Sequence, residues 1–119
     1  MRYLSFVKAS ENQGVPPQSL MNAMGPLMAE GLADGSLVQT GGLARTASMF
    51  RVRSHGGKLT VIDGPYTEAK EVIGGYAMLE YATREAAIEG TKKFMQLHID
   101  HWPEWTGECE VREIDYLAP

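Results

Sequence analysis

The segment VIDGPYTEAKE, residues 61–71, gathers several side chains that could do chemistry. Asp63 follows a strand-like apolar run, and if that strand keeps its two-residue period, Asp63 points to the inward side with the apolar residues. A carboxylate held there could act as a general base or anchor a ligand, with its pKa raised by partial burial and by neighbouring acids. Alternatively, Asp63 accepts backbone amide bonds in an Asx-type turn, where Pro65 fixes one dihedral angle and Gly64 permits the bend.

Four further side chains near Asp63 are candidate ligand-binding groups. Tyr66 offers a hydroxyl, and Glu68 and Lys70 offer opposite charges, although this turn could equally be solvated and carry surface ion pairs of little worth. Arg51 belongs to a basic group around the expected hairpin: Arg45, Arg51, Arg53 and Lys58. This group could steer a carboxylate or phosphate ligand toward Asp63, or it could simply pair with acids on the opposite strand.

Histidines form a second candidate site. His98 and His101 lie on one face if the helix expected over residues 83–98 continues past residue 97. Zinc requires at least three protein ligands and no third is evident nearby, so we predict no metal and no cofactor. His98 falls on the apolar face of its helix, which makes it a core or interface histidine or a group that contributes to a ligand pocket.

The elements that position these groups follow from hydrophobic periodicity. Strands alternate with helices in the order of a ferredoxin-like β-α-β-β-α-β fold of the α+β class, with an extra β-hairpin and with both helices on one face of the sheet. The other face, with residues such as Tyr3 and Tyr76, would be bare, which predicts a homodimer in which a second copy covers it. The expected strands are 2–8, 37–40, 48–54, 57–63, 74–82 and 108–117, and the expected helices are 18–34 and 83–98.

Composition limits the class of protein. A chain of 119 residues, 44% hydrophobic and 22% charged, predicts one compact domain over residues 1–119. Its net charge of −4 argues against nucleic acid as a partner. No apolar run is long enough to span a membrane and no signal peptide is evident, so we expect no membrane association and a cytoplasmic location. The single cysteine, Cys109, lies between two glutamates, which would raise its pKa and disfavour a nucleophilic role.

Four segments carry a family resemblance: LADGSLVQTGGL at 32–43, GGKLTVIDGPYTEAKEVIGGY at 56–76, TREAAIEG at 83–90 and GECEVREI at 107–114. Together they resemble the YCII-related (YciI-like) family and, within it, the branch named for its DGPF motif. The resemblance implies a dimeric α+β barrel, in which two ferredoxin-like sheets pack face to face. It implies no settled activity, although some members are encoded beside or fused to extracytoplasmic-function sigma factors, and a His-Asp pair has been suggested as an active site in related members. Tyr66 replaces the phenylalanine of the motif name and adds a hydroxyl.

Three functions stay open at this level. The first is a small homodimeric binding or regulatory module that holds an organic ligand in a cleft beside Asp63, Tyr66 and the helix face. The second is an enzyme that uses Asp63 as a general acid or base, assisted by a histidine, Tyr66 or Lys70. The third is a protein-interaction partner of a transcription factor, such as a sigma factor.

Overall fold

The computed structural model describes residues 1–115 of the chain. Its elements confirm the predicted order of strands and helices and define a mixed α+β fold. The predicted last strand reached residue 117; residues 116–117 lie outside the described part, and within it the strand ends at Glu113. The elements are β1 (Arg2–Ala9), α1 (Gln18–Asp34), β2 (Leu37–Gly42), the short 3-10 helix η1 (Thr46–Ser48), β3 (Phe50–His55), β4 (Lys58–Asp63), β5 (Val72–Glu80), α2 (Arg84–His101) and β6 (Gly107–Glu113).

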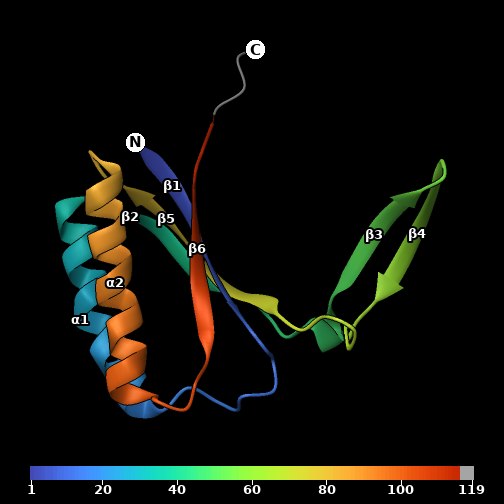
Figure 1. The fold of residues 1–119 in the computed structure, drawn as a ribbon, viewed down its shortest axis with the longest axis horizontal. Helices are drawn as coiled ribbons and strands as arrows, with labels where there is room; N and C mark the ends of the chain where they lie inside the picture. Colours follow the sequence, from blue (N-terminus) through green and yellow to red (C-terminus); the bar gives the residue numbers. More distant parts are fainter. Residues whose placement is uncertain (116–119) are drawn as a thin grey trace.

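Four of the strands form one antiparallel sheet in the order β2-β5-β1-β6. The first strand of the chain is therefore central, with β5 on one side and β6 on the other. Both helices pack on the same face of this sheet, whereas β3 and β4 form a separate two-stranded hairpin (Figure 1). This arrangement agrees with a ferredoxin-like core plus an added hairpin.

The two helices follow from clear local signals. The Thr83 side chain caps α2 by accepting a hydrogen bond from the Ala86 amide at 3.1 Å, as its position before the helix predicts. Helix α2 buries Ala87 and His98, and helix α1 buries Leu20. Helix α1 runs unbroken through Pro26. Within residues 1–115, no helix is long and apolar enough to cross a membrane.

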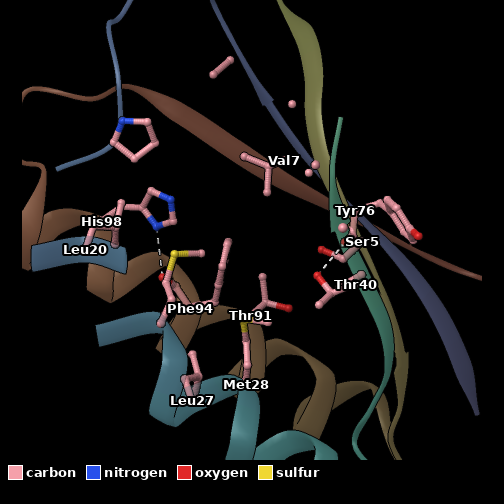
Figure 2. Close-up of a pocket in the computed structure, with 18 of the residues that line it drawn as sticks. Ser5, Val7, Leu20, Leu27, Met28, Thr40, Tyr76, Thr91, Phe94 and His98 are labelled. Carbon is pink, nitrogen blue, oxygen red and sulfur yellow. Dashed lines mark hydrogen bonds between the residues drawn. The ribbon is translucent and has the colours of Figure 1, made fainter. Parts of the chain in front are cut away.

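The face of the sheet without helices carries a partly exposed apolar group that we call the sheet face: Leu4, Phe6, Tyr76 and Met78. Phe6 pairs with Tyr76 and Leu4 with Met78 across β1 and β5. The prediction that Tyr3 lies here is wrong. Tyr3 alternates with the residues of the sheet face and is only 5% exposed, because it shares the helix-covered side with Ser5. Tyr76 does lie on the uncovered side, and Figure 2 shows its ring turned away from the helices.

The β3–β4 hairpin confirms the clearest local prediction. Gly56 and Gly57 both have positive φ, at 57° and 76°, as a tight hairpin turn requires. One side of the hairpin carries the apolar residues that we call the hairpin face, and these are between 57% and 77% exposed: Phe50, Val52, Leu59 and Val61.

Asp63 pairs with Phe50 and lies on this same side, as its spacing predicted. The expectation that this side points inward is wrong for the single chain, because the hairpin extends away from the sheet and helices (Figure 1), and Asp63 is exposed. The described part of the chain is therefore a helix-covered sheet with a projecting hairpin.

Candidate functional site

A large cavity lies between the two helices and the sheet. Its volume is about 890 Å³, and its lining is mostly apolar. Figure 2 shows side chains from α1, α2, β1 and β2 around the space. A cavity of this size is in the range of pockets that hold small organic molecules.

Helical and strand periodicity explains which side chains reach the cavity. The apolar stripe of α1 supplies Leu20, Leu27 and Met28, spaced seven and eight residues apart on one face. Alternation along β1 turns Ser5 and Val7 toward the helices. The sequence therefore indicates which residues of each element share a side, but the unfilled space between helices and sheet appears only in the structure.

Three polar side chains at the cavity already donate hydrogen bonds to backbone carbonyls. The Thr40 hydroxyl donates to the Tyr76 carbonyl at 2.9 Å, and the Thr91 hydroxyl donates to the Ala87 carbonyl at 2.8 Å. His98 Nδ1 lies 3.1 Å from the carbonyl of Phe94, four residues earlier in α2. On these three side chains, what remains for a ligand is acceptor capacity: the hydroxyl lone pairs and the second histidine nitrogen.

His98 is the titratable group most closely enclosed by the cavity walls. It is 7% exposed, and burial lowers the pKa of its imidazole while the Phe94 carbonyl opposes this in part. The ring is neutral at pH 7, so Nδ1 carries the proton that donates to Phe94 and Nε2 is an acceptor. Its orientation is further held by Phe94 and Trp105, whose ring centroids lie 4.9 Å and 4.6 Å away.

Three of the predicted site residues do come together, but at the hairpin rather than at the cavity. The Arg51 guanidinium lies 3.6 Å above the centre of the Tyr66 ring, and Arg51 Nη1 lies 3.0 Å from Glu68 Oε1. The Tyr66 hydroxyl is buried and finds no hydrogen-bond partner within residues 1–115. This group is an internally paired cluster at the base of the hairpin.

The remaining predicted residues lie apart from one another. Asp63 sits at the end of β4, and within the described chain no hydrogen bond to its carboxylate is seen, including the amide bonds expected for an Asx-type turn. Lys70 borders a small hollow together with Gln13 and Glu108. Of the predicted site residues, His98 alone lines the large cavity. The structure therefore separates the histidine from the aspartate.

No metal-binding group of three or more His, Cys, Asp or Glu side chains is found in residues 1–115. His98 and His101 do share one helix, because α2 extends to His101. His98, however, already uses one ring nitrogen on the Phe94 carbonyl. Its contacts are those of a structural or ligand-facing histidine.

A polar contact that sequence reasoning missed holds the DGPY turn, residues 63–66, in place. The Glu11 carboxylate, from the loop after β1, accepts from the Thr46 amide at 2.8 Å and from the Thr46 hydroxyl at 2.6 Å. The same hydroxyl oxygen accepts from the Tyr66 amide at 3.3 Å. Glu11 lies 35 residues from Thr46, and no local spacing signals such a contact.

This contact predicts an acid-sensitive component of stability. The hydroxyl of Thr46, followed by its amide, lowers the pKa of Glu11 below its ordinary value of 4.5. The stabilisation is therefore fully present above about pH 4.5. It is lost as the pH falls through the lower pKa that Glu11 has in the folded state. We expect Glu11→Gln to be less stable than the native chain at pH 7, with the difference shrinking toward pH 3. Urea unfolding at a series of pH values measures it.

The matched control is Glu104→Gln, because Glu104 is exposed and makes no hydrogen bond within the described residues. Its stability difference from the native chain should stay small at every pH. A Glu11→Gln difference that is the same at pH 3 and pH 7 would contradict the assigned role of the Glu11 carboxylate.

Together, the helix-covered antiparallel sheet and the mostly apolar cavity beside it define a small α+β protein of ferredoxin-like arrangement. The chain belongs to the family of the YCII-related domain, whose model matches residues 1–98. That description names a domain and no activity. A search of curated proteins finds no match.

Proposed function

We propose that this protein is a binding module for a small, mainly apolar organic molecule that carries a hydrogen-bond donor. The observation that supports this best is the cavity of about 890 Å³ between helices and sheet, with its mostly apolar lining. Ligand pockets typically combine such a lining with a small number of placed polar groups that orient the ligand.

The donor on the ligand is argued from three polar side chains at the cavity. Thr40, Thr91 and His98 donate to backbone carbonyls, so they can only accept from a bound molecule. A carboxylate or phosphate would find no donor among these three groups and would lose its hydration. A neutral molecule with one hydroxyl or N–H group fits this chemistry.

The position of Asp63 favours binding over an enzyme built on this residue. A general base must lie within hydrogen-bond reach of the proton it removes. Asp63 does not line the cavity, and the hairpin that carries it extends away from the helices (Figure 1). The neutral His98 faces the same space as the ligand and would serve as an acceptor that orients it.

Within the family, we assign the chain to the branch that has the DGPF motif. The sequence Asp63-Gly64-Pro65-Tyr66 supports this assignment, with tyrosine as the aromatic residue. The link to sigma factors that this branch implies would make the binding module regulatory.

Fluorescence titration with N-phenyl-1-naphthylamine tests the proposal, because this probe is apolar and carries one N–H donor. We expect saturable binding at one site per chain. Val7→Phe, which places a larger, aromatic side chain in the cavity, should weaken binding at least tenfold. Val15→Phe is the matched control, because Val15 is 85% exposed and does not line the cavity. No saturable binding, or equal binding by the Val7→Phe variant, would overturn the proposal.

His98→Phe tests the hydrogen bond separately. Removing one acceptor should weaken binding of N-phenyl-1-naphthylamine by roughly 3- to 10-fold, the value of one hydrogen bond. Binding of 1-phenylnaphthalene, which lacks the N–H group, should change much less. Equal losses for both probes would show that His98 only shapes the cavity.

A further inference from the structure

The cavity between helices and sheet runs along nearly the full length of both helices. On α1 its lining extends from Leu20, in the first turn, to Asp34, the last residue of the helix. At a rise of about 1.5 Å per residue, these two residues lie about 21 Å apart along the helix axis. On α2 the lining extends from Ala86 to His98, which is about 18 Å. The space is therefore elongated in the direction of the helices.

The same space is narrow across the helices. A volume of about 890 Å³ spread over about 20 Å of length leaves a mean cross-section of about 45 Å². Figure 2 shows helix side chains on one side of this space and Val7 of β1 on the other; the helix side chains are Leu27, Met28, Thr91 and Phe94. Such a cross-section fits one extended chain and is too small for a compact molecule of the same volume.

The two ends of the cavity differ in chemistry. At the end where α1 begins and α2 finishes (Figure 1), the ring centroid of Trp105 lies 4.6 Å from that of His98. Trp102, which is 7% exposed, stacks beside Trp105 at 6.1 Å, so aromatic rings wall this end. The lining at the other end includes exposed charged side chains: Glu30, Asp34, Glu89 and Lys93. That end therefore faces water.

We infer that the ligand of this cavity is a linear aliphatic chain with a hydroxyl or N–H group at one end. The inference rests on the binding function proposed above and adds the shape of the ligand. The polar end donates to Nε2 of His98, and the chain lies along the helices toward Ala86. Methionine side chains are flexible and adapt to a chain, and α1 contributes three of them to the lining: Met21, Met24 and Met28.

Displacement of N-phenyl-1-naphthylamine from the native protein by linear alcohols tests the shape. Each methylene group that becomes buried should tighten binding by roughly two- to fourfold. Since the cavity extends about 18 Å from His98 to Ala86, this gain should continue from 1-hexanol through 1-octanol and 1-decanol to 1-dodecanol. 1-Dodecanol should bind at least tenfold more tightly than cyclododecanol, which holds the same number of carbon atoms in a ring. A gain that stops at 1-octanol, or cyclododecanol binding as tightly as 1-dodecanol, would overturn the inference.

Ala86→Phe tests how far the chain extends from His98. The added ring should fill the far end of the cavity, so that 1-dodecanol binds at least tenfold more weakly. Binding of 1-hexanol should change less than twofold, because the shorter chain does not reach this end. Ala33→Phe is the matched control, since Ala33 is exposed on α1 and does not line the cavity, and it should leave both affinities unchanged. Equal losses for the two alcohols in Ala86→Phe would contradict a chain that begins at His98.

The binding function and the shape of the ligand can fail separately. If the native chain does not bind N-phenyl-1-naphthylamine, the binding function itself fails, and the inferred ligand fails with it. If this probe binds and the alcohols displace it with no dependence on chain length, only the linear shape is overturned.

Discussion

Replacing Gly64 with alanine should destabilise the native chain by about 3 kcal/mol or more, or prevent folding. A Cβ atom at this position would collide with the backbone carbonyl of Thr46, and it would also lie 3.3 Å from the Met49 carbonyl oxygen. The Gly64 amide already donates to Met49 at 2.8 Å, which fixes the two segments against each other. Backbone atoms cannot rotate away as a flexible side chain can. Chemical unfolding of the variant measures the loss.

Gly74→Ala is the matched control for this prediction. Gly74 lies in β5, and a Cβ atom there would meet nothing within 4 Å. Alanine at Gly74 should leave stability unchanged or raise it slightly, because it reduces the freedom of the unfolded chain. If the Gly64 variant were as stable as the Gly74 variant, the close contact between the DGPY turn and η1 would not exist in solution.

Leu20→Ala should cost about 2–5 kcal/mol, the usual range for truncating a buried leucine. Leu20 is 1% exposed and is the largest fully buried side chain within residues 1–115. It lies in the first turns of α1, where it also borders the cavity, so the truncation enlarges a space that is already unfilled. The expected effect on the melting temperature is a fall of roughly 10 °C or more.

Leu32→Ala is the comparison within the same helix. Leu32 is 58% exposed on α1, and alanine is the better helix former, so this change should stay within about 0.5 kcal/mol of the native chain. Both variants should be measured at one protein concentration, because self-association of any kind makes the melting temperature depend on concentration. Similar losses of stability for Leu20→Ala and Leu32→Ala would mean that α1 does not pack against the sheet as described.

Much of the fold was predictable because it depends on local interactions. The Thr83 cap, the apolar side of α2 and the pairing of β3 with β4 across Gly56 and Gly57 all follow from contacts between residues close in sequence. The strand order along the chain could also be predicted. The side taken by Tyr3 could not, because alternation shows which residues share a face but does not show which face the helices cover.

The candidate site was only partly predictable. His98 was identified from its place on an apolar helix face, and the structure shows it at the cavity. Gly64 was noted as a residue that permits a bend, yet the structure shows no positive φ there. Residue 64 is glycine because the Thr46 backbone lies too close to leave room for a side chain. This close contact is between two separate segments of the chain, so the sequence of neither segment predicts it alone.

By itself, the sequence determined the type and order of the elements, the family of the chain and the amphipathic faces of its helices. Only the tertiary structure decided that Asp63 and His98 lie apart, that Glu11 holds Thr46, and that a cavity separates helices from sheet. The physical reason is the range of the interactions. Periodicity and caps act over a few residues, whereas the position of the hairpin and the volume left between layers depend on contacts between distant segments.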